Sequence, residues 1–108
     1  MTASSDAVLS VVYPFSPGAR FDIDYYRDIH LPMVRRSLSD AGLLEASAVI
    51  GVAALDGAPA PYAAISRLRF SDVEQIKAGL AGPAGAALIG DVANFTDITP
   101  TIQISALA

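Results

Sequence analysis

Residues 21–34, FDIDYYRDIHLPMV, constrain the fold of this chain more than any other segment. Asp22 is a residue type that caps helix N-termini, and the acidic Asp24 favours the positive end of a helix. These signals predict a helix over residues 23–39, with Gly42 just beyond its end. An amphipathic helix of that length needs an apolar surface to pack on, and the segments around it have the character of strands.

Pro32 lies inside this predicted helix. A proline there removes one backbone hydrogen bond and crowds the carbonyl of Asp28, so we expect a kink next to His30. His30 is the one histidine of the chain. Because the ordinary pKa of an imidazole lies near neutrality, this residue is the first candidate for proton chemistry.

Four segments are rich in β-branched residues or alternate between apolar and polar positions: residues 7–13, 46–54, 61–70 and 101–107. A turn at residues 56–59 makes the second and third of them an antiparallel hairpin. In the third segment, Ile65, Arg67 and Arg69 share one face, and the opposite face holds Ala64, Ser66, Leu68 and Phe70.

A second helix is predicted between the third and fourth strands. Ser71 to Glu74, SDVE, reads as a capping box, and an apolar stripe of Val73, Ile76 and Leu80 follows. The pair Gly82-Pro83 interrupts this helix, with further helical turns at residues 84–90.

The order of elements is β-α-β-β-α-β, which predicts an α+β, ferredoxin-like fold with an antiparallel sheet and helices on one face. A chain of 108 residues forms a single domain over residues 1–108. With 53% hydrophobic residues, a domain this small cannot bury all of its apolar surface, and part of that surface lies on the uncovered sheet face. We therefore expect a homodimer in which a second copy covers that face.

The formal net charge of −4 argues against nucleic acid and against anionic membrane surfaces, which both select basic patches. The chain has no cysteine, so thiolate metal sites and disulfides are excluded, and one histidine cannot form a multi-histidine metal centre. No apolar run is long enough to span a membrane, and the N-terminal residues lack the pattern of a signal peptide. The expected compartment is the cytoplasm.

Three strings together resemble the EthD family of the dimeric α+β barrel superfamily: residues 21–34, the strand ending at Phe70, and GDVANFTDITP at residues 90–100. The resemblance extends from residue 8 to residue 105 and places His30 at the His-x-Pro element of the family. It implies a ferredoxin-like subunit whose sheet pairs with that of a second subunit into a closed barrel. Related barrels include cofactor-free monooxygenases, polyketide cyclases, a lactone isomerase and haem-degrading enzymes, so shared architecture does not fix the reaction.

Helical spacing places Tyr26, His30 and Met33 on one face, where a phenol and an imidazole share a pocket wall. We expect His30 as general acid/base and Tyr26 as a hydrogen-bond donor to a substrate oxygen. The neighbouring Tyr25, about 100° away around the helix, is expected in packing or an interface. Candidate substrate-binding residues are Tyr13, Met33, Tyr62, Asn94 and Phe95.

Each assignment has a structural alternative. His30 would otherwise bond a backbone carbonyl freed by the proline, and either tyrosine would otherwise pack in the core. Before the last strand, Asp91 and Asn94 are predicted to form an Asx-type turn, and Phe95 is expected in the core. In the catalytic interpretation, Asn94 or Asp97 instead orients His30 or binds a substrate oxygen.

The favoured interpretation is an enzyme without a cofactor or metal that acts by general acid/base chemistry on an aromatic or polyketide-like ligand, by cyclisation, isomerisation, decarboxylation or ring oxidation. The alternative is a non-catalytic accessory protein of the same fold that binds a small apolar metabolite. A haem-binding role would need His30 as axial ligand and cationic partners for the propionates, which the acidic charge disfavours.

Overall fold

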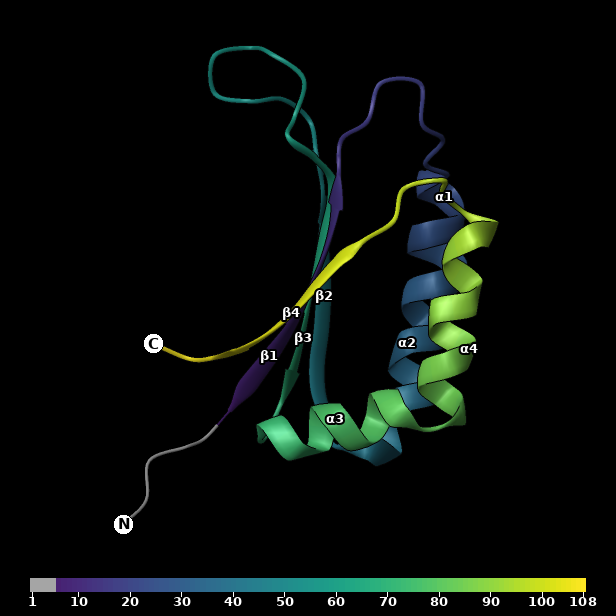
Figure 1. Cartoon of the computed structure of the whole chain (residues 1–108), viewed down its shortest axis with the longest axis vertical. Helices are drawn as coiled ribbons and strands as arrows, with labels where there is room; N and C mark the ends of the chain where they lie inside the picture. Colours follow the sequence, from purple (N-terminus) through teal and green to yellow (C-terminus); the bar gives the residue numbers. More distant parts are fainter. Residues whose placement is uncertain (1–5) are drawn as a thin grey trace.

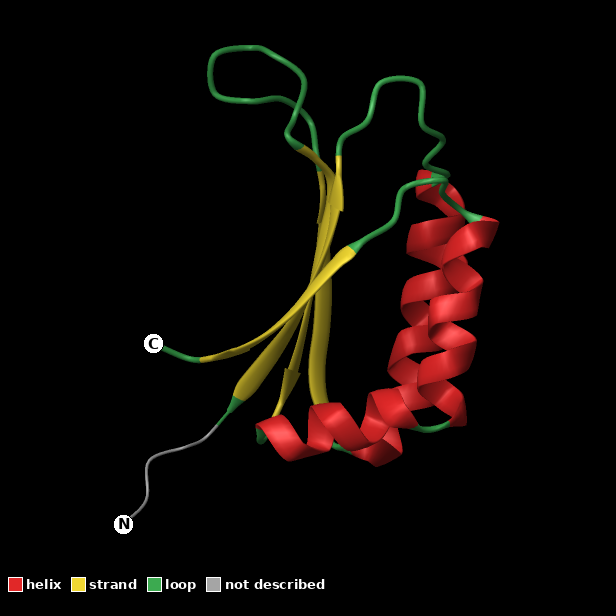
Figure 2. Cartoon of the chain, in the orientation of Figure 1, coloured by secondary structure: helices red, strands yellow, loops and turns green. Residues whose placement is uncertain are grey.

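The computed structural model describes residues 6–108, and the fold it shows is a four-stranded antiparallel sheet with helices on one face (Figures 1 and 2). The strands are β1 (Ala7–Pro14), β2 (Leu43–Ile50), β3 (Tyr62–Phe70) and β4 (Thr101–Ala106). Their order across the sheet is β2-β3-β1-β4, with β1 in the centre beside β4. This is the ferredoxin-like arrangement, and the predicted fold class is confirmed.

The first helical run connects β1 to β2. It consists of α1 (Ile23–Tyr25), the π-helical turn η1 (Tyr26–His30), α2 (Leu31–Leu38) and the 3-10 turn η2 (Ser39–Ala41). The second run connects β3 to β4 and consists of α3 (Val73–Ala81), α4 (Pro83–Asp91) and the 3-10 turn η3 (Val92–Asn94). In Figure 1, α2 and α4 lie side by side over the sheet, and α3 crosses its lower end. Within the part of the chain that the structure describes, no helix is long and apolar enough to cross a membrane.

The first run begins where the sequence predicts, because the Asp22 carboxylate accepts a hydrogen bond from the Tyr25 N–H at 3.1 Å. The distortion expected at Pro32 takes the form of the π-helical turn, in which the Leu31 N–H reaches back to the Tyr26 carbonyl. Proline has no N–H to continue the α-helical ladder, and a wider turn directly before it accommodates that loss. Gly42, at a φ of +98°, then ends the run in the left-handed conformation that glycine tolerates.

Two predicted boundaries are wrong by a few residues. Strand β2 covers Leu43–Ile50 rather than residues 46–54, because the turn at Gly42 leads the chain directly into the sheet. The second helix is capped by Asp72, whose carboxylate accepts from the Gln75 N–H at 2.9 Å, and not by Ser71 with Glu74. The helix break at Gly82-Pro83 is confirmed, with Pro83 opening α4.

The core between sheet and helices has an aliphatic part and an aromatic part. Leu9, Leu38 and Ile76 lie in the aliphatic part, which is continuous under α2 and α3. Tyr13, Tyr26 and Phe95 form the aromatic part, with rings in edge-to-face or tilted contacts. This aromatic part fixes the end of the first helical run on which His30 lies.

Candidate functional site

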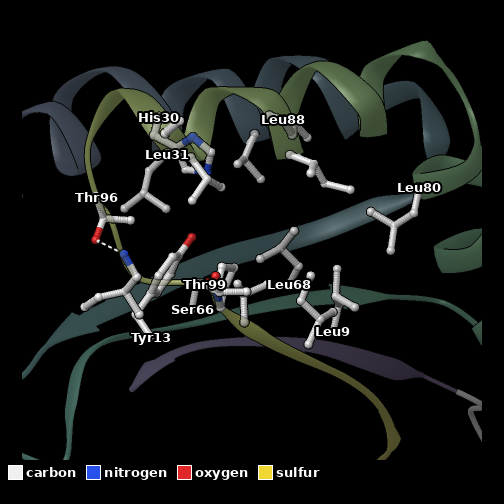
Figure 3. A pocket seen from close by; sticks show the side chains of 18 of the residues that line it. Leu9, Tyr13, His30, Leu31, Ser66, Leu68, Leu80, Leu88, Thr96 and Thr99 are labelled. Carbon is white, nitrogen blue, oxygen red and sulfur yellow. Dashed lines mark hydrogen bonds between the residues drawn. The ribbon is translucent and has the colours of Figure 1, made fainter. Parts of the chain in front are cut away.

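A cavity of about 450 Å³ lies between the sheet and the helices α2 and α4 (Figure 3). Its walls are mainly aliphatic, as residues such as Leu31, Leu68 and Leu88 show. The polar side chains that line it are those of Tyr13, His30, Ser66, Thr96, Asp97 and Thr99. Its size is in the range of sites that take small organic molecules, and its walls suit an apolar one.

His30 and Asp91 form a buried hydrogen-bonded pair at the wall of this cavity. His30 ends the π-helical turn and Asp91 ends α4, and Nδ1 of the imidazole lies 2.8 Å from Oδ2 of the carboxylate. His30 is 6% and Asp91 8% exposed. A carboxylate only accepts hydrogen bonds, so the pair places the imidazole proton on Nδ1 and leaves a lone pair on Nε2. No residue of the described chain bonds to Nε2, and the ring lines the cavity.

Two further donors hold the Asp91 carboxylate in place. The Tyr25 hydroxyl donates to Oδ1 at 2.7 Å, and the Asn94 amide donates to the same oxygen at 2.9 Å. Burial by itself raises the pKa of Asp91, but the hydrogen bonds from Tyr25, His30 and Asn94 outweigh it and hold that pKa below its ordinary value. Asp91 is therefore a carboxylate at neutral pH, able to stabilise a positive charge on the imidazole.

Aromatic rings fix the imidazole from two directions. The Tyr26 ring stacks on the imidazole at an interplanar angle of 15°, with the ring centroids 5.9 Å apart. The centroid of the Phe95 ring lies 4.7 Å from that of the imidazole. Both aromatic side chains are at most 1% exposed. Packing and the bond to Asp91 thus leave His30 one orientation, as a pre-organised proton acceptor needs.

Hydroxyl groups from the sheet lie across the cavity from His30. Tyr13 on β1 and Ser66 on β3 both face the helices and line the cavity. Figure 3 shows the Tyr13 ring with its hydroxyl directed toward His30. Burial, with a smaller effect of the adjacent Tyr26, raises the pKa of Tyr13, so its hydroxyl is a hydrogen-bond donor at neutral pH.

The structure brings two of the predicted site residues, His30 and Tyr13, to the cavity. Tyr26 and Phe95 lie behind the imidazole in the aromatic core and do not line the cavity, and Met33 packs against the aliphatic core. Tyr62 lines a separate, smaller hollow near the loop after β2. The expectation that Phe95 lies in the core is confirmed, since its exposure is 0%.

The adjacent tyrosines lie on two sides of this cluster. Tyr25, predicted in packing or an interface, stacks on Phe95 and also donates to Asp91 through its hydroxyl. Tyr26 shares the face of His30, as expected, because their rings stack, and its hydroxyl is buried with no hydrogen bond of standard geometry among the described residues.

Asp91, and neither Asn94 nor Asp97, is the partner of His30. Asn94 and Asp97 were the candidates for orienting the imidazole, but Asn94 bonds to Asp91, and Asp97 accepts from the backbone N–H of Arg20 at 3.2 Å. Asp91 and Asn94 bond side chain to side chain at 2.9 Å across the 3-10 turn η3, and not by the side-chain-to-backbone bond of the predicted Asx-type turn. Within residues 6–108, no three metal-binding side chains cluster together.

The sequence matches the EthD domain over residues 19–99, which include His30, Asp91 and the aromatic residues around them. The chain belongs to the EthD family. An EthD-like protein of known structure from Ralstonia eutropha JMP134 is 36% identical, with 95% of this chain and 92% of that chain covered and a TM-score of 0.85. No curated protein matches the sequence.

More distant structures share the fold of this EthD protein. An EthD family protein from Bacillus halodurans C-125 has a TM-score of 0.77 at 18% identity, covering 95% of this chain and 99% of that chain. SnoaB from Streptomyces nogalater, described as a cofactor-independent oxygenase, has a TM-score of 0.58 at 8% identity, covering 98% and 95% of the two chains.

Proposed function

We propose that this EthD protein is a cofactor-independent enzyme that moves a proton on a small, neutral, largely apolar ligand bound in the cavity between sheet and helices. The observation that carries the proposal is the His30–Asp91 pair, with Nδ1 bonded to a buried carboxylate and Nε2 open to the cavity. A His–carboxylate pair of this kind orients a general base and stabilises the imidazolium that forms.

His30 acts as the base through Nε2. The proton of an acidic C–H or O–H group of the ligand passes to Nε2, and the electron pair of the broken bond stays on the ligand. Asp91 stabilises the resulting imidazolium at 2.8 Å, and His30 returns the proton to another atom of the ligand. A positioned acid/base of this type contributes roughly 10²- to 10⁴-fold to a rate.

The structural neighbours are consistent with chemistry in this fold without a cofactor, because SnoaB is described as a cofactor-independent oxygenase. At 8% identity that likeness concerns the fold, and the chemistry proposed here rests on the residues of this chain.

Hydrogen–deuterium exchange tests the proposal. Neutral aromatic ketones with acidic C–H groups, such as 2-tetralone and 1-indanone, are followed by proton NMR in D2O with the wild type, His30→Gln and the surface control Lys77→Gln. We expect exchange above the buffer rate with the wild type and the control, and a loss of roughly 10²-fold or more with His30→Gln. Ligand binding without any exchange would instead support the non-catalytic binding role.

We also propose a homodimer formed through the sheet face opposite the helices. On that face Val49, Ile65 and Val12 are cross-strand neighbours and form an apolar row over three strands. Val49 is 62% exposed in the single chain. A protein with a ferredoxin-like fold from Bacteroides fragilis, at 8% identity, is described as dimeric, which is consistent with a second copy covering the row.

A further inference from the structure

The sheet side of the cavity carries two hydroxyl groups set in aliphatic surroundings. Tyr13 pairs with Ala64 and Val11 pairs with Ser66 in the register of β1 and β3, so Tyr13 and Ser66 are diagonal neighbours on one sheet face. Both residues are buried, at 1% and 5% exposure, and both line the cavity. His30 lies on the opposite wall, and Figure 3 shows the three side chains around the same end of the cavity.

No side-chain hydrogen bond of Tyr13 is found within residues 6–108, and its hydroxyl is not one of the fully enclosed unpaired atoms, so it opens onto the cavity that Tyr13 lines. Buried hydroxyl groups are nearly always bonded, because an unpaired one keeps the full cost of its desolvation. The adjacent Tyr26 hydroxyl is fully enclosed, and its interaction with the Ser66 side chain lowers its pKa against the larger effect of burial. A ligand with an oxygen acceptor at this end of the cavity would complete the site.

The charges around the cavity narrow the class of ligand. Its titratable lining residues besides Tyr13 are His30 and Asp97, and no lysine or arginine is among the residues that line it. Asp97 faces Arg20, with Arg20 Nε 3.8 Å away. A carboxylate or phosphate ligand would therefore lack a cationic partner inside the cavity, whereas a neutral carbonyl oxygen needs only hydroxyl donors.

We propose that Tyr13 and Ser66 form a carbonyl-oxygen subsite, and that the ligand class of the cavity is a neutral, apolar ketone with an acidic C–H beside its carbonyl. This inference rests on the proposed role of His30. The C–H bond breaks, the proton goes to His30 Nε2, and the electron pair forms the carbon–carbon double bond of an enolate. The negative charge moves to the oxygen, where the Tyr13 and Ser66 hydroxyls donate hydrogen bonds to it. Return of the proton to carbon or oxygen balances the step without an oxidant or reductant.

Infrared spectroscopy of 2-tetralone labelled with carbon-13 at the carbonyl tests the subsite directly. Hydrogen bonding lowers the carbonyl stretching frequency, so the bound ketone should absorb at lower frequency than in hexane. With Tyr13→Phe the frequency should rise toward the hexane value, and with Ser66→Ala it should rise less. The matched control is Tyr62→Phe, which removes a tyrosine hydroxyl on β3 that lies outside this cavity and should leave the frequency unchanged.

The affinities for 2-tetralone and tetralin provide an independent test. Tetralin is a hydrocarbon of similar shape that lacks the carbonyl oxygen. Tyr13→Phe should weaken 2-tetralone binding roughly tenfold and leave tetralin binding unchanged, because one hydrogen bond is lost. Thermal melting establishes that each variant is folded. If Tyr13→Phe fails to fold, Ser66→Ala replaces it in the test, because this substitution removes only one oxygen atom.

Three results would overturn the subsite: an unshifted carbonyl frequency in the wild type, an equal loss of tetralin and tetralone affinity in Tyr13→Phe, or no binding of tetralone by the wild type. Failure of the proposed function is distinguishable from these. A shifted carbonyl that depends on Tyr13, together with no proton exchange, would leave the subsite standing and remove the role of His30 as base. His30→Gln should keep the shifted frequency while exchange is lost.

Discussion

His30 Nδ1 and Asp91 Oδ2 lie 2.8 Å apart inside the protein, although 61 positions separate the two residues in the chain. Each residue ends a helical element, the π-helical turn η1 and the helix α4, which the fold places side by side over the sheet. The pair fixes the tautomer of the one histidine and leaves Nε2 facing an apolar cavity.

Asp91→Asn should lower proton exchange on the ketone probes about as strongly as loss of the histidine does. An asparagine amide placed toward Nδ1 favours the tautomer with the proton on Nε2, so the base no longer has a lone pair facing the ligand. The measurement is the exchange rate of Asp91→Asn. The control is Asn94→Ala, which removes one hydrogen-bond donor to Asp91 and keeps the negative charge of the Asp91 carboxylate. Exchange that survives in Asp91→Asn would contradict the role of the pair.

Acid should remove the stability that Asp91 provides. Its folded-state pKa is lowered, since the hydrogen bonds from Tyr25, His30 and Asn94 outweigh burial, and a lowered pKa stabilises the fold above the unfolded value of about 3.9. That contribution is lost as the pH falls through the folded pKa. In urea unfolding, the free-energy gap between the wild type and Asp91→Asn should therefore shrink as the pH falls below about 4. If the free-energy difference between the wild type and Asp91→Asn grew in acid, the pKa of Asp91 would not be lowered in the folded protein.

Tyr26→Phe should raise the free energy of unfolding by about 1 kcal/mol, because the substitution removes a buried hydroxyl without a hydrogen bond of standard geometry. The contrasting variant is Tyr25→Phe, which loses the bond to Asp91 and should be less stable than the wild type. Urea unfolding of both variants measures the difference. Destabilisation by Tyr26→Phe would mean that its hydroxyl has a partner in the folded protein.

Much of this architecture follows from local signals. The alternation of β3 predicts its buried face, on which Ala64, Ser66, Leu68 and Phe70 are all buried in the structure. The aspartate at position 22 marks the helix start, and Gly82-Pro83 marks the break between α3 and α4. These features depend on residues that are close to one another in the chain, so they can be predicted from local sequence patterns.

The partner of His30 is not a local property. Asp91 reaches it only because α4 lies beside the first helical run, and no spacing in the sequence encodes that contact. The bond from the Tyr25 hydroxyl to Asp91 is equally non-local, since 66 positions separate the two residues. The stacking of Tyr26 on His30 is local, because helical spacing places the two residues on one face. The proline signalled a distortion, but not its type.

Pro32→Ala should convert the π-helical turn into α-helix, because alanine restores the N–H that proline lacks. The intrinsic gain is up to about 3 kcal/mol, less the packing adapted to the wider turn. Stability should then rise while exchange falls, as His30 rotates away from Asp91. A crystal structure of the variant and its exchange rate check this together. A retained π-helical turn with full activity would show that Pro32 does not cause the turn.

Light scattering should show a dimer at micromolar concentration, with the apolar row of Val49, Ile65 and Val12 in the interface. A stable interface buries on the order of 1,200–2,000 Å² in total. Ile65→Asp should yield monomers, because it places an unpaired charge at the centre of the row. The matched control is Ile29→Asp, an exposed position on the helical side. A monomeric wild type would end the homodimer proposal.

Nitrogen-15 NMR of the imidazole tests the central claim most directly, because the untagged protein contains one histidine and gives one pair of ring-nitrogen signals. In the neutral imidazole we predict a protonated Nδ1 with a strongly deshielded proton, as the bond to Asp91 requires, and an unprotonated Nε2. Adding 2-tetralone should move the Nε2 signal and leave Nδ1 nearly unchanged. A proton on Nε2, or an Nε2 signal that does not respond to any ketone probe, would contradict the assignment of His30 as the base.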